Sequence, residues 1–364
     1  MKKKRERSSM LFLSALLIWG VTPSLLRADP LLKSGDGNRE MDYDIALKAS
    51  FNLNKGVVPG SDAWALGGMI DELYMGFTGQ LTPHIKVTGT LDTVNLTSHS
   101  DLEYLPVQDL RTQFEYGPEL NIWVGRIIPA TDRDGLSGGF QLNSWNFPGL
   151  VWYFPGVFEG RMYGAEVWGN DPAGVFKWQL GCFDGRQGAF NSNISPLFSG
   201  RLMLCLLDPE EGYYYPAAYY GKKEILSLAV GGMYQADGAG TANGSLVTSM
   251  GDYSEYNADL LFEKKVTDTN VASVESSYYR YNTQGATGAV EGEGFFVSGG
   301  YLIGQIQPNL RWQRFTPTGQ ATADRLDGGL AYIVDGANTR IALNYGKVFG
   351  QAQDEFQLGT QVIF

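Results

Sequence analysis

The sequence is poor in the side chains that most often bind metals or carry out thiol chemistry. It contains 2 cysteines and 2 histidines in 364 residues. With so few of these ligands we expect no metal centre and no cofactor. The chain has no C-x-x-C-H motif, so it carries no c-type haem attachment site of its own. Alternation along their predicted strands points Cys182 and Cys205 to opposite faces of a sheet, which predicts free thiols.

Long apolar runs are also missing. Only Met10–Val21 is continuously apolar in character, and nothing after it approaches the 18 or so residues of a membrane-spanning helix. The basic stretch Met1–Arg7 precedes this run and a short polar segment follows it, which is the order of a secretory signal. We predict a signal peptide at 1–28, cleaved after Ala28. The alternative is a permanent N-terminal anchor helix, for which the run is too short.

Positive charge is scarce once this leader is removed. The leader holds Lys2, Lys3, Lys4, Arg5, Arg7 and Arg27 against Glu6, a net charge of +5, while the whole chain is at −11. The remaining 336 residues are therefore at −16. A chain this acidic is not expected to bind nucleic acid.

Glycine and aromatic residues are abundant. There are 47 Gly, 20 Tyr, 19 Phe and 8 Trp, a composition typical of a twisted antiparallel sheet with aromatic rings at a membrane interface. After a polar lead at 29–40, apolar and polar residues alternate with period two to the end of the chain. The pattern predicts sixteen strands at Met41–Leu53, Met69–Gly79, His84–Asn95, Val107–Tyr116, Glu119–Ile128, Arg161–Trp168, Val175–Asp184, Gly200–Asp208, Glu224–Gln235, Tyr253–Val266, Val271–Tyr281, Gly294–Gly304, Ile306–Phe315, Ala323–Val334, Ala337–Lys347 and Asp354–Phe364.

The connections between these strands alternate between short and long. Tight turns on one edge and long loops on the other are typical of a transmembrane β-barrel. The connection Pro209–Lys223 breaks the rule, because it is long and falls on the short-turn edge. It is either an unusual loop on that edge or a sign that strands have been merged or missed.

The final strand ends on an aromatic residue. Phe356, Leu358, Val362 and Phe364 share one face, and Gln357, Gly359 and Gln361 share the other. This ending resembles that of the Gram-negative outer-membrane porins. The resemblance implies an all-β, closed barrel over 41–364 in the bacterial outer membrane, in contact with lipid and lipopolysaccharide. It further implies that Phe364 is a signal to the barrel-assembly machinery and that the protein is a homotrimer.

The longest connection, Pro129–Gly160, follows the fifth strand and its ending NIWVGRII. In general-diffusion porins a long third external loop in this place folds into the lumen and narrows it. The resemblance implies the same for 129–160, with Arg126 on the wall facing Asp132, Arg133 and Asp134. Arg126 shares parity with apolar neighbours, so it reaches the lumen only through a bulge. The alternative is a surface lid without a gate.

Further charged side chains fall on the polar face of the strands. Lys86, Arg111, Arg201, Arg311 and Arg340 are our candidate pore-lining residues on the barrel wall. Rings of charged side chains set the ion preference of pores. The alternative is that each forms a cross-strand ion pair that fills the interior.

Three other motifs resemble functional sites or known sequences. The run Asp132–Gly135 begins like a calcium loop but lacks the later acidic ligand. Ser98, His99 and Asp101 lie together in a loop, which leaves a barrel hydrolase as a minor alternative. Tyr213–Gln235 resembles a stretch of porins for short-chain amides or urea. Its tyrosines also fit an interfacial aromatic girdle.

These observations predict a water-filled channel for passive diffusion of small hydrophilic solutes or ions, and not an enzyme. The main alternative is a porin-like sleeve around a periplasmic or multihaem electron-transfer partner.

Overall fold

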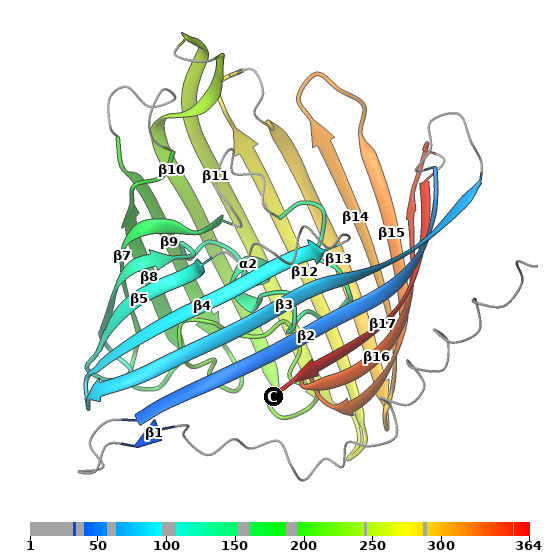
Figure 1. Cartoon of the computed structure of the whole chain (residues 1–364), viewed down its shortest axis with the longest axis horizontal. Coiled ribbons are helices and arrows are strands. Elements are labelled where there is room, and N and C mark those ends of the chain that lie inside the picture. The colour runs from blue at the N-terminus through cyan, green and yellow to red at the C-terminus, as the bar shows by residue number, and fades with distance from the viewer. Residues whose placement is uncertain are drawn as a thin grey trace, which may run out of the picture.

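The computed structural model describes residues 32–33, 40–56, 63–96, 107–151, 160–186, 195–243, 246–286, 290–351 and 353–364. The predicted signal peptide and His99 lie outside these ranges. Sixteen strands, β2 to β17, close into an antiparallel barrel, and a short β1 pairs with β2 (Figure 1). The elements are β1 (Leu32–Lys33), β2 (Glu40–Lys55), β3 (Trp64–Thr82), β4 (Ile85–Leu96), β5 (Val107–Glu115), β6 (Asn121–Ile127), α2 (Arg133–Ser137), β7 (Met162–Asn170), β8 (Phe176–Phe183), β9 (Leu197–Cys205), β10 (Ile225–Asn243), β11 (Leu246–Lys265), β12 (Asn270–Asn282), β13 (Gly292–Ile303), β14 (Ile306–Pro317), β15 (Ala323–Asp335), β16 (Thr339–Val348) and β17 (Gln353–Ile363).

The last strand closes the barrel against the first. β17 pairs with β2 over ten residues, with Leu358 opposite Phe51. The backbone N–H of Phe364 donates to the carbonyl oxygen of Ile45 at 2.8 Å, so pairing continues to the last residue. Each of the described strands β2 to β17 pairs with a neighbour on both sides, as a barrel in lipid requires. We call the rim that holds this end of the chain the short-turn edge.

The wall is apolar outside and polar inside, and β9 shows the alternation clearly. Phe198, Leu202 and Leu204 point outward and are about half exposed, while Ser199 and Arg201 point inward and are buried. Because successive side chains of a strand face opposite sides, one sequence pattern produces both surfaces. The prediction of an all-β, sixteen-stranded transmembrane barrel is confirmed.

Strand boundaries differ from the predicted ones by three or more residues at β3, at β9, and at β10 and β11. β3 begins at Trp64 and ends at Thr82, where we predicted Met69–Gly79. β9 begins and ends three residues earlier than predicted, because Leu206 and Leu207 continue the apolar pattern beyond the end of the strand. β10 and β11 extend toward each other until Asn243 pairs with Leu246, where we predicted a long loop over 236–252. The β10 part of this extension, 236–243, consists of Ala, Gly, Thr, Asp and Asn, so it carries no large apolar side chains whose alternation could reveal it.

The two cysteines lie on opposite faces, as predicted. Cys182 is exposed on β8, Cys205 is buried at the end of β9, and both are free. Among the described residues no helix has both the length and the apolar character needed to cross a membrane.

Candidate functional site: two segments inside the barrel

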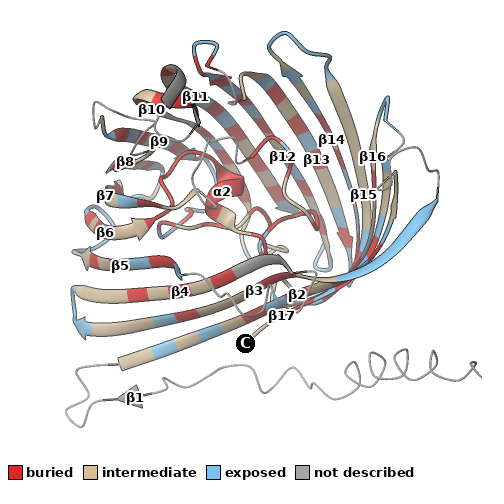
Figure 2. Ribbon diagram, turned by 45° about the horizontal axis from the view of Figure 1, so that its top comes forward, coloured by how far each residue is buried: buried red, intermediate tan, exposed pale blue. Residues whose placement is uncertain are grey.

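The segment after β6 lies within the ring of strands. We call residues 128–151 the inner loop; they include α2, which Figure 2 shows inside the barrel and buried. Three basic or amide side chains from three strands hold the middle of this loop through its carbonyl oxygens. Lys48 Nζ of β2 donates to Gly139 at 3.1 Å, Arg340 Nη1 of β16 to Leu142 at 2.9 Å, and Gln361 Nε2 of β17 to Phe140 at 2.8 Å.

The end of the inner loop contacts another part of the wall. Arg311 Nη1 of β14 donates to the Asn146 carbonyl at 2.7 Å, and Tyr281 of β12 donates to the Leu150 carbonyl at 2.6 Å. These contacts carry the inner loop across the interior from β2 and β17 to β12. Charged donors to buried carbonyls give strong hydrogen bonds, so the loop backbone after α2 is held without regular structure.

A helix cap shapes the start of the inner loop. Asp132 is the N-cap of α2 and accepts from the Gly135 backbone N–H at 2.8 Å. Tyr279 of β12 donates to Asp132 at 3.1 Å and lies 3.3 Å from Asp134. These aspartates thus have structural partners within the barrel. Burial, and then the neighbouring Glu275, raises the pKa of Asp134 well above its usual value.

The strands leave room for this loop at specific glycines. A Cβ atom added to Gly231 of β10 would lie 2.1 Å from the carbonyl oxygen of Thr131. One added to Gly359 of β17 would lie 2.2 Å from the ring of Trp145. Only a residue without a side chain allows such a close approach.

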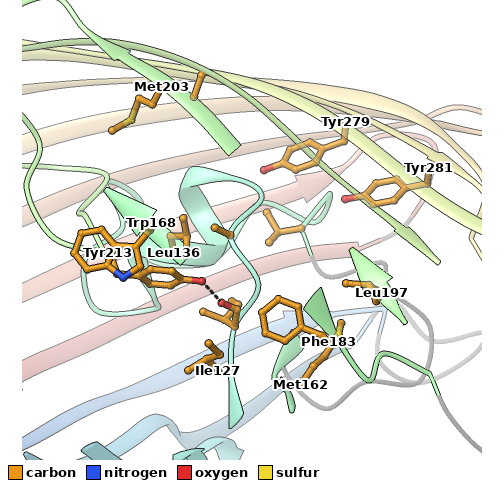
Figure 3. Close-up of a cluster of buried hydrophobic side chains, with 14 of the residues drawn as sticks. Ile127, Leu136, Met162, Trp168, Phe183, Leu197, Met203, Tyr213, Tyr279 and Tyr281 are labelled. Atoms are coloured by element: carbon orange, nitrogen blue, oxygen red, sulfur yellow. Dashed lines mark hydrogen bonds between the residues drawn. The ribbon is translucent and has the colours of Figure 1, made fainter. Parts of the chain in front are cut away.

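A second segment also enters the barrel, from the short-turn edge. We call residues 206–224 the β9–β10 connection. Tyr213 and Tyr215 are almost fully buried, and Tyr213 donates from its hydroxyl to the Ile128 carbonyl at 2.6 Å (dashed line in Figure 3). The Ala217 backbone N–H donates to the Gln141 carbonyl at 3.0 Å. The connection thus packs directly against the inner loop.

This placement decides between two interpretations of the sequence. No additional strand lies within the β9–β10 connection, so it is an unusual loop on the short-turn edge. Its buried tyrosines, Tyr213 and Tyr215, do not belong to an interfacial girdle, which corrects that interpretation. They face inward because the chain turns into the barrel. There the Tyr213 hydroxyl donates to the Ile128 carbonyl, and the Tyr215 hydroxyl accepts from Arg201.

A buried network of charges joins the two segments to the wall. Arg133 of the inner loop donates to both carboxylate oxygens of Glu210 at 2.8 and 2.6 Å, and to Ser227 at 2.6 Å. Arg201 of β9 pairs with Asp259 of β11 at 2.8 Å and donates to the Thr131 carbonyl at 2.9 Å. All five side chains are 5% exposed or less, so these charges depend on one another for compensation.

Glu210 is the acidic centre of the network in the β9–β10 connection. Burial alone would raise the pKa of this carboxyl, but Arg133, with help from Tyr219 and Ser227, lowers it to about 2 from 4.5. Lys177 adds a further positive charge and donates to the Glu210 carbonyl at 3.2 Å. Glu210 therefore stays charged, and its pairing persists, at neutral pH.

Most of the predicted pore-lining residues point inward. Arg111, Arg201, Arg311 and Arg340 are buried inside the barrel. Arg111 stacks over the ring of Trp123 at 4.6 Å, and Arg311 pairs with Asp327 at 3.1 Å.

Lys86 and Arg126 are not buried inside the barrel. Lys86 pairs with Glu115 at 2.7 Å near the short-turn edge and is about a third exposed. Arg126 is the exception to the inward placement. It lies opposite Leu110 and Tyr163, which are outward and exposed, and its guanidinium is 6.0 Å from the Tyr163 ring. No bulge reverses its parity, so the prediction that Arg126 faces the lumen is wrong.

Among the described residues, buried acidic side chains outnumber buried basic ones in the interior. The buried basic residues are Lys48, Arg111, Arg133, Lys177, Arg201, Arg311 and Arg340. The buried acidic residues are Asp71, Glu72, Asp92, Asp109, Asp132, Asp134, Glu166, Glu210, Glu255, Asp259, Glu263 and Glu275. Asp42 and Asp44 of β2 lie on the inward face near the short-turn edge and are exposed.

An open polar pocket lies between the inner loop and β14 to β17. Trp145, Asn146, Arg311, Asp327 and Glu355 contribute to its lining. Arg311 supplies hydrogen-bond donors to this pocket, and Asp327 and Glu355 supply acceptors. Among the described residues no cluster of three or more His, Cys, Asp or Glu side chains could hold a metal ion.

Comparison with solved structures identifies the architecture. An anion-selective porin from Comamonas acidovorans is 12% identical, with a TM-score of 0.64, and the match covers 90% of this chain and 100% of the porin. This chain has the fold of a bacterial porin. A mutant of the Rh. blastica porin matches at 11% identity and a TM-score of 0.54, over 89% of this chain and 100% of that one. OmpT of Vibrio cholerae in its trimer form matches at 10% identity and a TM-score of 0.56, over 90% and 100%.

No protein-family model matches this porin-fold chain, and no curated protein does.

Proposed function

We propose that this porin-fold chain is an outer-membrane channel through which small hydrophilic solutes or ions diffuse down their gradients. The observation that carries the proposal is the combination of an apolar outer wall with a polar interior crossed by the inner loop. An apolar wall suits lipid, and a polar interior suits water and hydrated solutes. In this role the inner loop narrows the pore, with Arg311, Arg340 and Lys48 holding it in place.

The surplus of buried acidic groups supports a preference for cations. Rings and walls of one charge sign set ion preference in pores, and the exposed Asp42 and Asp44 add negative charge near one mouth. Export through a cleaved signal peptide, recognition of Phe364 by the assembly machinery, contact with lipopolysaccharide and a homotrimeric state belong to the same proposal. A trimer form of the neighbour OmpT supports the last of these.

The interior favours a channel over a sleeve, whereas Ser98, His99 and Asp101 of the hydrolase alternative lie outside the described residues. The inner loop and the β9–β10 connection occupy space that a sleeve would have to leave for a partner protein. His84 lies on an exposed turn, with its ring 5.7 Å from that of Tyr116, and is not placed against a buried acid. A channel role requires no reacting group.

Solute flux into lipid vesicles tests the proposal. Purified protein is reconstituted into vesicles, and swelling is followed after addition of neutral sugars of increasing size. We expect rapid swelling with the smallest sugars and a sharp fall for larger ones, because the inner loop narrows the path. Vesicles that swell no faster than protein-free vesicles would contradict the proposal.

A further inference from the structure

We propose that the β9–β10 connection is a built-in plug that closes one side of the lumen at the short-turn edge, and that the Arg133–Glu210 pair anchors it. The inference rests on the proposed channel function and deepens it, because the plug would set the cross-section open to solutes. Glu210 is then a positioning residue for permeation and not part of the permeation path.

The path of the chain is the first observation. The antiparallel ladder of β9 and β10 continues beyond the strands, with the Asp208 N–H donating to the Glu224 carbonyl at 2.9 Å. A tight turn after this pair would have been enough to join the strands. Instead the chain leaves the edge and reaches across the interior. Tyr220 accepts from Arg340 of β16 at 3.4 Å, far around the barrel from β9.

The degree of burial is the second observation. Tyr213, Tyr215, Ala217 and Ala218 are at most 4% exposed, unlike an ordinary turn at a barrel rim. Figure 3 shows Tyr213 beside Trp168 and Leu136, within the buried cluster. Gly212 and Gly221 bracket this stretch with φ angles of 78° and 77°, which favour glycine and allow the chain to turn in and out.

The anchor is the third observation. Arg133 contacts the connection twice, at the Glu210 carboxylate and at the Pro216 carbonyl, the latter at 2.9 Å. Tyr219 donates to the same carboxylate at 2.7 Å, and Lys177 donates to the carbonyls of Glu210 and Gly212. Loss of one partner from a buried ion pair leaves the other charge uncompensated, which is strongly destabilising. The β9–β10 connection is therefore either docked or released, and a partly docked state is disfavoured.

The position under the inner loop is the fourth observation. The Tyr213 hydroxyl and the Ala217 backbone N–H donate hydrogen bonds to the inner-loop carbonyls of Ile128 and Gln141, respectively. A solute on that side of the lumen would meet both segments in series. The exposed inward carboxylates, Asp42 and Asp44, lie on β2 instead. We infer that the permeation path enters on the β2 side at the short-turn edge, nearer that edge than the point at which Lys48 holds the inner loop.

Single-channel conductance of two variants tests the plug. In the first variant, a four-residue turn with Asn-Gly at its centre replaces residues 209–223 and joins Asp208 to Glu224. In the second variant, Glu210→Ala removes the anchor. We expect the shortened variant to conduct at least about twofold more than the wild type, because conductance follows the open cross-section. Glu210→Ala should switch between the wild-type level and a higher one. The control is Arg314→Ala, which breaks an exposed Arg–Asp pair of 2.7 Å outside the lumen and should leave conductance unchanged.

The outcomes separate this inference from the proposed function. Equal conductance of the wild type and both variants would overturn the plug and leave the channel standing. Silence of all folded proteins would overturn the channel function itself. A silent wild type with a conducting variant would support the plug and show that it closes the whole pore. Heat-modifiable migration on a gel verifies that each barrel is folded, and Glu210→Ala decides the matter if the shortened chain does not fold.

A reversible lock gives an independent test. Gln141→Cys and Ala217→Cys are introduced with Glu210→Ala, in a chain carrying Cys182→Ser and Cys205→Ala, because the Ala217 N–H lies 3.0 Å from the Gln141 carbonyl oxygen. Oxidation should return the conductance of Glu210→Ala to the wild-type level, and a reductant should restore the higher level. A cross-linked protein that keeps the higher conductance would contradict the plug.

Discussion

The glycine at position 231 offers a sharp test of how closely the inner loop packs against the wall. Gly231→Ala would place a Cβ atom 2.1 Å from the Thr131 carbonyl oxygen and 2.9 Å from Asn257 Oδ1. The nearer atom belongs to the backbone, so no side-chain rotation relieves the clash. The inner loop must retreat by roughly 1 Å or more to reach an ordinary contact distance. The Thr131 carbonyl also accepts from Arg201 at 2.9 Å, so that bond weakens as the loop moves.

The structure indicates the size of the effect. Overpacking a well-filled interior costs about 1–3 kcal/mol, and a hydrogen bond to a charged group contributes about 1.5–3 kcal/mol. Because the two effects share one displacement, we expect Gly231→Ala to lower the unfolding free energy by about 2–4 kcal/mol. The matched control is Gly328→Ala on β15, whose Cβ would lie at an ordinary 3.6 Å from Leu310. It should gain up to about 1 kcal/mol, since alanine restricts the unfolded chain more than glycine does.

Urea unfolding in lipid vesicles, followed by tryptophan fluorescence, measures both variants. Trp145 of the inner loop and Trp123 of β6 are buried and report on the interior. Equal stability of Gly231→Ala and Gly328→Ala would refute the close packing of the inner loop against β10. So would an unchanged fluorescence spectrum in the folded Gly231→Ala protein.

Three further predictions follow from the same structure. A lipid-soluble maleimide should label Cys182 and not the buried Cys205. A disulfide between the two would contradict their placement on opposite faces of the barrel wall. Glu210 has a pKa lowered from 4.5 to about 2, so its stabilising contribution is complete above pH 4.5 and is lost as the pH falls toward 2. Conductance should therefore rise in that window, and a rise that persists in Glu210→Gln would argue against the role of this carboxyl. Phe364→Ala should lower the amount of protein inserted in the outer membrane while leaving the unfolding free energy of the assembled barrel nearly unchanged, because the ring is 49% exposed and the backbone pairing remains. A large loss of unfolding free energy would show that the ring has a structural role instead.

Alternation with period two predicts the number and order of the strands. It succeeds because each strand places lipid on one side and polar atoms on the other, so every strand in the apolar band carries the same signal. It failed at the end of β10, which extends without large apolar residues, and it missed the matching extension of β11. It also misplaced β9 by three residues, where Leu206 and Leu207 continue the pattern outside the strand.

Parity was a better guide to the charged residues than resemblance was. Arg201, Arg311 and Arg340 have inward parity and are buried inside the barrel, as predicted. Arg126 has outward parity, and the likeness of its surroundings to a porin constriction led to the wrong face. The ladder with β5 runs through Arg126 in unbroken register, so its side chain follows its neighbours.

The β9–β10 connection could not be predicted in detail. Its length on the short-turn edge was a visible anomaly, but tyrosines suit both a membrane interface and a buried interior with hydrogen-bond acceptors. The anchor joins Arg133 to Glu210, 77 residues apart, and no local pattern links them. Long-range partners of this kind depend on the closed barrel, which brings the two segments together.

The central claim is that this porin-fold barrel conducts, along a path narrowed by the inner loop and by the β9–β10 connection. Single-channel current across a planar bilayer, with a salt gradient, tests it most directly. We predict discrete steps of small conductance and a reversal potential of the sign that marks cation preference, because acidic groups outnumber basic ones in the interior. A folded protein that gives no steps under any polarity would contradict the account.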